Sequence, residues 1–509
     1  MKHIKKLAGL LLALVMALSL AVTAFADEST TYSITINNST AGHTYEAYQI
    51  FTGDLHEGVL SNIKWGSSVS NAASLSDAAA VAEKLDTNYT GTDKMTVADL
   101  LEMITLGTPA ADSGETSNPY VISGLTAGYY LVKDQDGSLT GDNDSYTEYI
   151  IKVVGDVTAT PKSDVPEVQK KVKDINDSTD TTKTDWQDSA DYDIGDSIPF
   201  QLKATLADNV SSYTTYKVVF HDTLSKGLTY NNDAKVYIDG TETNGFTVTA
   251  DGTTTLTVSC DDVKALGAGN SSVITVEYTA KLNENAVLGS AGNPNEVYLE
   301  YSNNPNKSET GDNETGNTPK DVAIVFTYKT IINKVDGENQ PLTGAAFKLE
   351  KLIKGKDGAE DTWTTVKEFT VDETITSFTF SGLDDGRYKL TETKTPAGYN
   401  TIDPIYFVIE ATHDETADAP ALKTLNAYLT DVNGNKQTEM KEGESVNIDL
   451  GTVDLTAGSI TTTVVNKSGS ELPSTGGIGT TIFYVLGGVL VLAAVVLLVT
   501  KKRMSGAEK

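Results

Sequence analysis

The chain has 509 residues, enough for several domains of ordinary size, and it is strongly acidic. Its 70 Asp and Glu residues against 39 Lys and Arg residues give a formal net charge of −31, which argues against nucleic acid or an anionic lipid surface as a partner. A single cysteine, Cys260, excludes an intramolecular disulfide. Five His residues, with no HExxH or GxSxG motif, give no support to a hydrolase.

The N-terminus has the three parts of a secretory signal peptide. Residues 1–6 are basic, residues 7–22 are apolar, and Ala24-Phe25-Ala26 forms a small-residue cleavage site. The apolar run is short for a membrane-spanning helix, and polar sequence follows it. We therefore predict that the chain is exported and that residues 1–26 are removed.

The central part of the chain has the pattern of a β protein. Short runs rich in Val, Ile, Thr and Tyr alternate with a period of two, as in residues 216–224 and 273–280, and Asp-Gly and Asn-Gly turns separate them. Helical periodicity is confined mainly to residues 76–85 and 97–104. This pattern predicts a mainly β fold of three tandem β-sandwich domains, the first with helical insertions.

Polar, proline-containing segments at residues 161–166 and 303–320 mark the expected domain boundaries. The predicted parts are a signal peptide (1–26), an N-terminal domain (27–162), a second domain (163–320), a third domain (321–468) and a C-terminal segment (469–509).

The C-terminal segment combines a short motif, an apolar stretch over residues 482–499 and a basic tail at 501–503. The motif consists of Leu472, Pro473, Ser474, Thr475 and Gly476. The stretch can just span a bilayer, and the positive-inside rule keeps the tail in the cytoplasm. This order resembles the cell-wall sorting signal of Gram-positive surface proteins. The resemblance implies that a sortase cleaves after Thr475, holds its carbonyl as a thioester, and makes the membrane helix a temporary retention device.

Two sets of polar residues are in phase with the apolar faces of predicted strands, where charge is costly to bury unless it is paired. The sets are Lys170, Asp222 and Asn295 in the second domain, and Lys334, Glu392 and Asn466 in the third. Burial favours a neutral amine and a protonated carboxyl, so the lysine could attack the Asn amide, polarised by the acid, and release ammonia. The pattern alone leaves a buried salt bridge or a misjudged register open, and Lys171 is an alternative to Lys170.

Several stretches resemble the sortase-assembled major pilins of Gram-positive bacteria. Residues 388–399, YKLTETKTPAGY, look like the E-box of these pilins and of collagen-adhesin B-type domains, and residues 332–336 and 464–467 resemble the first and last strands of such a domain. Parts of residues 170–305 resemble a collagen-adhesin A-type domain. The resemblance implies tandem Ig-like sandwiches that contain Lys170–Asn295 and Lys334–Asn466 isopeptide bonds, assisted by Asp222 and Glu392.

Lys162 follows Pro161 at the predicted end of the first domain and resembles the pilin-motif lysine, although Thr-Pro-Lys-Ser stands where related chains often have Tyr-Pro-Lys-Asn. The resemblance implies that Lys162 of one copy attacks the Thr475 thioester of another. The opening strand of the first domain, residues 32–37, contains no lysine, so we predict no isopeptide bond within residues 27–160.

Together these features predict the shaft subunit of a covalent pilus, anchored in the cell wall, supporting adhesion and lacking enzymatic turnover. The expected partners are a class C sortase, other copies of the chain, minor pilins and peptidoglycan, with no cofactor and no metal. A monomeric wall-anchored adhesin, which would not need Lys162, and a basal or tip pilin are the alternatives.

Overall fold

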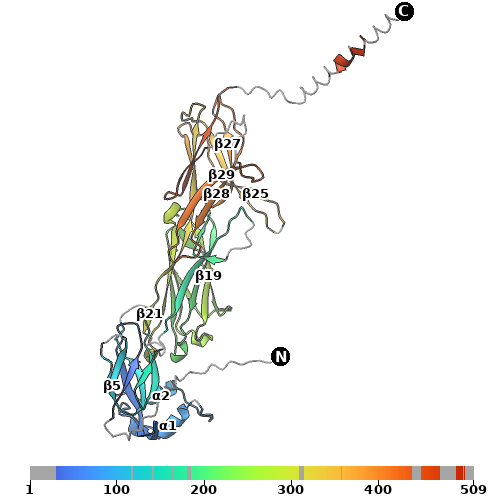
Figure 1. The fold of residues 1–509 in the computed structure, drawn as a ribbon. Helices are drawn as coiled ribbons and strands as arrows, with labels where there is room; N and C mark the ends of the chain where they lie inside the picture. Colours follow the sequence, from blue (N-terminus) through green and yellow to red (C-terminus); the bar gives the residue numbers. More distant parts are fainter. Residues whose placement is uncertain are drawn as a thin grey trace, which may run out of the picture.

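The protein is an elongated rod of β-sandwich domains that follow one another in chain order, with the first domain (blue) at one end and the third (orange) at the other (Figure 1). The computed structural model describes residues 30–86, 88–115, 118–139, 143–161, 164–179, 185–308, 314–356, 358–437, 449–469, 486, 489–493, 495–496 and 498. The predicted signal peptide, Lys162 and the sorting motif at 472–476 lie outside these residues.

The predicted membrane helix, residues 482–499, is only partly described, and its described residues are helical. Among the described residues, no helix combines the length and apolarity needed to cross a bilayer.

The first domain pairs a three-stranded sheet, β5-β1-β8, with a sheet in the order β3-β2-β6-β7 that carries β4 on β2. The strands are β1 (Tyr32–Ile36), β2 (Tyr45–His56), β3 (Val59–Trp65), β4 (Ala111–Asp112), β5 (Tyr120–Leu125), β6 (Gly128–Asp134), β7 (Glu148–Val153) and β8 (Val157–Ala159). Helices α1 (Ala78–Leu85) and α2 (Val97–Met103) confirm the predicted insertions. Asp77 caps α1, and Thr96 and Asp99 form a capping box on α2.

The second domain is a larger sandwich whose sheets run β10-β9-β12-β19-β15-β16, with β14 on β19, and β11-β22-β20-β13-β18-β17, with β21 on β20. Alternation along β12 buries Ile198, Phe200, Leu202 and Ala204 between the sheets. The strands are β9 (Glu167–Lys173), β10 (Trp186–Gln187), β11 (Ser189–Asp191), β12 (Ser197–Thr205), β13 (Val218–Leu224), β14 (Leu228–Tyr230), β15 (Lys235–Ile238), β16 (Thr241–Thr243), β17 (Thr247–Asp251), β18 (Thr255–Cys260), β19 (Val273–Leu282), β20 (Asn293–Ser302), β21 (Thr315–Asn317) and β22 (Asp321–Phe326).

Strand β22 follows the boundary that we predicted at residue 320, yet it pairs with β20 and β11 of the second domain. Sheet pairing of that domain therefore continues to Phe326. The polar run that suggested the boundary contains a turn of 3₁₀ helix, η5 (Pro305–Lys307), and β21, and it leads back into the sheet. Other 3₁₀ turns are η1 (Ala72–Ser74), η2 (Val210–Ser212), η3 (Lys264–Leu266) and η4 (Gly289–Ala291).

The third domain packs the sheet β26-β23-β31-β30 against β25-β24-β27-β28-β29. Its strands are β23 (Tyr328–Val335), β24 (Ala346–Ile353), β25 (Thr362–Glu368), β26 (Ser377–Leu383), β27 (Gly386–Lys394), β28 (Ile405–His413), β29 (Leu422–Thr430), β30 (Asp449–Asp454) and β31 (Ser459–Val465). The first and last strands, β23 and β31, are parallel neighbours, with Lys334 opposite Val464. This pairing brings the two ends of the domain together.

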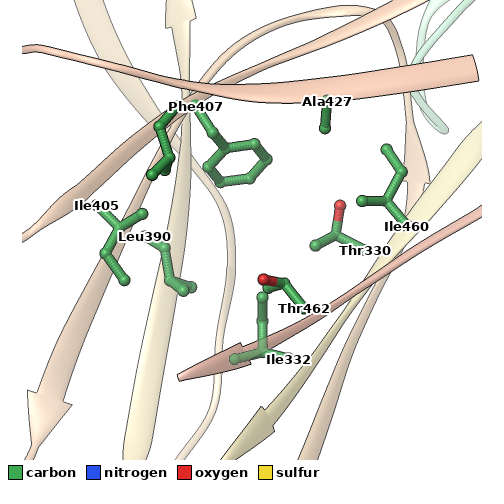
Figure 2. Close-up of a pocket in the computed structure, with 9 residues that line it drawn as sticks. Thr330, Ile332, Leu390, Ile405, Phe407, Ala427, Ile460 and Thr462 are labelled. Atoms are coloured by element: carbon green, nitrogen blue, oxygen red, sulfur yellow. The ribbon is translucent and has the colours of Figure 1, made fainter. Parts of the chain in front are cut away.

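A small apolar cavity lies between the two sheets of the third domain (Figure 2). Ile332, Leu390, Phe407 and Ile460 are among the side chains that point into it. Its volume of about 20 Å³ is close to that of a single water site, so it is a packing defect of the core and is too small for an organic ligand.

The second and third domains are joined by backbone as well as side-chain contacts. The amide of Asp188 donates to the carbonyl of Glu415, and the amide of Ile194 donates to the carbonyl of Gly382. Gly289 and Gly458 pack so closely that a Cβ on Gly289 would lie 2.4 Å from the Gly458 nitrogen. The junction therefore has a defined geometry and is not a free linker.

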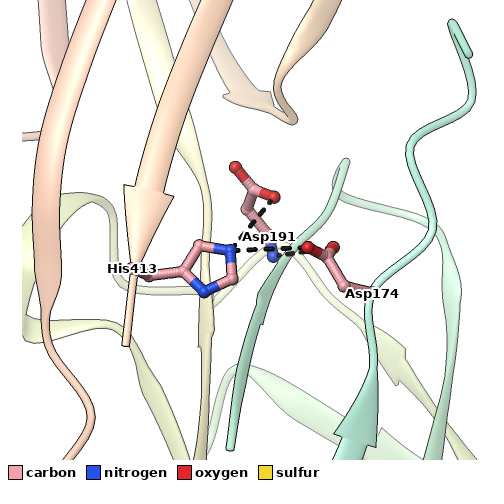
Figure 3. Close-up of side chains that lie close together, drawn as sticks. All are labelled: Asp174, Asp191 and His413. Atoms are coloured by element: carbon pink, nitrogen blue, oxygen red, sulfur yellow. Dashed lines mark hydrogen bonds and ion pairs between the residues drawn. The ribbon is translucent and has the colours of Figure 1, made fainter. Parts of the chain in front are cut away.

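A cluster of ionisable side chains fills the same junction (Figure 3). His413 of the third domain points its Nε2 at Asp174, 3.4 Å away, and at Asp191, 3.8 Å away, both from the second domain. The hydroxyl of Ser189 lies 2.7 Å from the other ring nitrogen. Because the imidazole faces two carboxylates, its charged form bridges the two domains.

Candidate isopeptide sites

The predicted residues of the second domain meet inside its core. Lys170 comes from β9, in one sheet, whereas Asp222 and Asn295 come from β13 and β20, which are neighbours in the other. All three side chains are completely buried. Period-two alternation places them inward because each is in step with apolar residues of its own strand. The structure thus brings together residues that are far apart in the sequence.

A fourth side chain, Tyr278 of β19, joins this set. Lys170 Nζ donates to Asp222 Oδ1 at 2.6 Å and to the Tyr278 hydroxyl at 2.7 Å. Asn295 Nδ2 donates to the same hydroxyl at 2.8 Å, and the hydroxyl donates to Asp222 Oδ2. One oxygen atom therefore contacts all three predicted residues.

Burial changes the proton affinities of this site. Desolvation lowers the pKa of Lys170 to about 8, although the charge of Asp222 acts in the opposite direction. Desolvation also raises the pKa of Asp222, against the effect of Lys170. The two groups are thereby moved toward a neutral amine and a neutral acid, which is the state that nucleophilic attack by the amine requires.

The neighbouring lysine, Lys171, lies on the opposite face of β9. Its side chain is one-quarter exposed and forms an ion pair with Asp188. Of the two lysines that the sequence left open, the structure places Lys170 beside Asp222 and Lys171 outside the core.

In the third domain two of the three predicted residues, Glu392 and Asn466, are in direct contact, whereas the Lys334 amine bonds to backbone carbonyls. Lys334 lies on β23, Glu392 on β27, and Asn466 directly after β31, and all three are buried. Asn466 Nδ2 donates to Glu392 Oε1 at 2.9 Å and to Oε2 at 3.1 Å. Lys334 Nζ donates to the carbonyls of Val335 and Val464. Burial lowers the pKa of Lys334 to about 8, although Glu392 raises it.

The orientation of both amides differs from the expected arrangement. We expected the acid to polarise the Asn carbonyl, but the amide nitrogen is the atom that faces Glu392 in the third domain and Tyr278 in the second. Asn295 Oδ1 and Asn466 Oδ1 are buried without a hydrogen-bond partner among the described residues. In each site the amide nitrogen that would leave therefore faces the acid, directly in the third domain and through Tyr278 in the second, so the acid is placed to exchange protons with that nitrogen.

Sequence reasoning missed Tyr278. It is in phase with the buried Val276 and Ala280, so it reads as an ordinary core aromatic. The available signal was its hydroxyl, because a buried tyrosine oxygen requires a polar partner and three polar residues were already predicted to share that core.

Three family models match the chain. They are described as a Gram-positive pilin backbone subunit 2, Cna-B-like domain (residues 194–305), a prealbumin-like fold domain (329–421) and an LPXTG cell wall anchor motif (464–505). The Cna-B-like description of the second domain differs from the A-type resemblance that we drew from its residues.

The trypsin-resistant surface T6 protein of Streptococcus pyogenes serotype M6 is 29% identical over 460 residues, which cover 79% of this chain and 78% of the relative. Among solved structures, the T6 backbone pilin of the same serotype, described as a modular three-domain structure, matches with a TM-score of 0.52 at 17% identity over 88% of this chain and 100% of that one. The full-length major pilin SpaD of Corynebacterium diphtheriae matches with a TM-score of 0.47 at 19% identity over 88% and 100%.

Tandem sandwich domains followed by a wall-anchor motif define a surface protein that is anchored in the cell wall. Within that class, the chain is similar to the backbone pilins of Gram-positive bacteria, through the family model matched by residues 194–305 and the T6 relative that aligns with 79% of its length. It is a structural shaft subunit of a wall-anchored pilus and not an enzyme.

Proposed function

We propose that the shaft is polymerised by a class C sortase that links Thr475 of one subunit to Lys162 of the next. The sortase cysteine displaces Gly476 from Thr475, and the Lys162 amine then displaces the cysteine, forming an amide and releasing the thiol. The match to a wall-anchor motif over residues 464–505 is the observation that carries the donor side. Lys162 follows the last strand of the first domain, whereas Thr475 follows the third domain, which gives a head-to-tail fibre.

Minor pilins and peptidoglycan are the remaining proposed partners. Minor pilins would end or decorate the shaft, and transfer of the last Thr475 carbonyl to a peptidoglycan precursor would anchor it. Adhesion is then the role of the assembled fibre.

The test of polymerisation is an immunoblot of cell-wall extracts after a denaturing gel. Wild-type cells should give a ladder of high-molecular-weight species, and Lys162→Ala should reduce it to monomer. Lys281→Ala is the matched control, because Lys281 is an exposed lysine of the second domain. A ladder that persists in Lys162→Ala moves the nucleophile to another lysine. No ladder in any strain favours the monomeric adhesin.

The second part of the proposal is that each buried set forms an isopeptide bond. The neutral lysine Nζ attacks Cγ of the Asn side chain, the new C–N bond forms, and Nδ2 leaves as ammonia. The lysine gives up one proton and the leaving nitrogen gains one, so no oxidant or cofactor is needed. The lowered pKa values of Lys170 and Lys334, the burial of both lysines and the contact of Lys170 with Asp222 support this reaction.

Intact mass tests these bonds directly. The mature chain should weigh less than its sequence by the mass of two ammonia molecules, and Asn295→Ala and Asn466→Ala should each abolish one of the two losses. A full-weight wild-type chain would refute both bonds.

A further inference from the structure

The hydroxyl of Tyr278 touches the attacking nitrogen, the leaving nitrogen and the acid of the second-domain site. We propose that Tyr278 is a catalytic residue of Lys170–Asn295 bond formation that relays a proton from Asp222 to the departing nitrogen of Asn295. The inference rests on the proposed isopeptide bond and adds a fourth participant to it.

Comparison of the two sites in this chain carries the argument. In the third domain the acid contacts the amide directly, since both Glu392 oxygens accept from Asn466 Nδ2. In the second domain Asp222 is one methylene shorter, and Asn295 Nδ2 donates to Tyr278, which in turn donates to Asp222. The tyrosine oxygen thus stands in the second domain where a glutamate oxygen stands in the third.

The proton balance of the reaction requires a proton transfer to Asn295 Nδ2, and the Tyr278 oxygen is placed to carry it out. After attack by the neutral amine, Lys170 Nζ carries a proton that it must lose and Asn295 Nδ2 lacks a proton that it needs to leave. Tyr278 gives its own proton to Nδ2, at 2.8 Å, and is reprotonated from Oδ2 of the neutral Asp222. Asp222 Oδ1, at 2.6 Å from Nζ, then accepts the proton that Lys170 must lose. The C–N bond breaks, ammonia leaves, and both groups return to their starting protonation states.

Packing fixes the hydroxyl in this position. Tyr278 is almost completely buried; its ring stacks on Phe200 with centroids 5.7 Å apart and meets Tyr230 edge-on at 5.5 Å. A phenylalanine would fill the same space, so Tyr278→Phe removes the oxygen and leaves the ring contacts in place. This allows the relay to be tested apart from the fold.

The experiment is a time course of bond formation in the full chain made by cell-free translation. Samples are quenched in acid and denaturant and digested, and the fraction of the cross-linked peptide joining Lys170 to Asn295 is measured. Tyr278→Phe should form this bond about a hundredfold more slowly than wild type, the usual effect of losing a general acid. The Lys334–Asn466 peptide from the same molecules should form at the wild-type rate.

Tyr230→Phe is the matched control. Tyr230 is a neighbouring buried tyrosine whose hydroxyl accepts from the Ala234 amide and not from the site, so its loss should leave the rate unchanged. A rescue separates relay from packing: Asp222→Glu, added to Tyr278→Phe, supplies an acid of the length found in the third domain and should restore most of the rate.

Each outcome has one meaning. Wild-type kinetics in Tyr278→Phe overturn the relay and leave the proposed bond intact. If Tyr278→Phe forms the bond slowly and the added Asp222→Glu does not restore the rate, the hydroxyl acts by positioning its neighbours. That result also overturns the relay. A wild-type chain without the Lys170–Asn295 peptide removes the bond itself, and the role of Tyr278 with it.

Discussion

The two buried lysines differ from most lysines in being close to losing their charge at physiological pH. Burial lowers the pKa of Lys170 and of Lys334 to about 8 in each case. Only the neutral amine can attack an amide, so the lysine must be deprotonated before either bond can form.

Bond formation should therefore accelerate with pH. The neutral fraction of each amine rises as the pH passes through about 8, so the rate of cross-link formation should increase roughly tenfold per pH unit below that value and level off above it. Cell-free chain sampled between about pH 6 and pH 9 provides the measurement. A flat profile would show that loss of the lysine proton does not limit the reaction.

In the third domain the acid can be tested by a nearly isosteric change. Glu392→Gln keeps the shape of the side chain but removes the group that exchanges protons with Asn466. We expect no ammonia loss from this domain and, by the loop-closure argument, a free energy of unfolding lower by about 5 kcal/mol. Glu350→Gln, which alters an acid paired with Lys348 and Lys389 in the same domain, should keep the bond.

The six predicted residues could be proposed from the sequence because strand alternation indicates which side chains point inward, although it left Lys171 open beside Lys170. Lys170 was placed by Val168 and Val172, and the structure puts its amine in the core. Tyr278 could not be assigned in this way. Its alternation says that it is buried, but the contacts of its hydroxyl depend on how β19 faces β13 and β20 across the sandwich, which no local pattern records.

At the scale of elements, the domain boundary shows a second limit of sequence reasoning. A polar run normally separates domains, but residues 303–320 precede the last strand of the second domain and not the first strand of the third. Whether β22 belongs to one sheet or the other is decided by its pairing with β20 and β11, since its own sequence would suit either sheet.

The junction between these domains should weaken as the pH rises. Burial lowers the pKa of His413, but hydrogen bonds and charges from Asp174 and Asp191 outweigh this effect and raise it to about 10. A histidine whose pKa is higher in the folded state stabilises that state most below its unfolded pKa of about 6.5, and the contribution is lost as the pH approaches 10. Asp385 of the third domain accepts a hydrogen bond from Asn176 of the second, and burial raises its pKa to about 8, so its ionisation acts in the same direction.

Amide hydrogen exchange can follow this effect at Asp188 and Ile194, which donate across the junction. Once exchange rates are corrected for the intrinsic effect of pH, protection should fall between about pH 6 and pH 10. His413→Gln should lose protection already at the lower pH, because two carboxylates would face no cation. His221→Gln, which changes a histidine paired with Glu300 away from the junction, should keep it. Unchanged protection in His413→Gln would show that the bridge does not hold the domains together.

At the scale of the whole molecule, the position of the proposed third-domain bond would set how far a subunit can extend. Lys334 and Asn466 lie at the ends of β23 and β31, which are adjacent in the sheet. The proposed covalent link would carry tension from one strand to the other and remove about 130 residues from the extensible path, on the order of 450 Å of extended chain.

Single-molecule pulling on the mature subunit tests this expectation. Wild type should show no unfolding step from the third domain, whereas Asn466→Ala should gain a step on the order of 450 Å. Asn426→Ala, an exposed asparagine on β29, is the control and should behave as wild type. A wild-type step of the same length would mean that the bond does not bear the load.

The proposed bond between the parallel neighbours β23 and β31 would also affect what happens after a subunit has been unfolded. With residues 334 and 466 joined, the third domain has the topology of a closed ring and cannot return to a linear coil. The entropy of closing that ring has already been lost, and the most distant contact in the sequence, normally among the slowest to form, is present before refolding begins. A fibre bent by flow and then released would thus recover its shape from rings whose ends never separated.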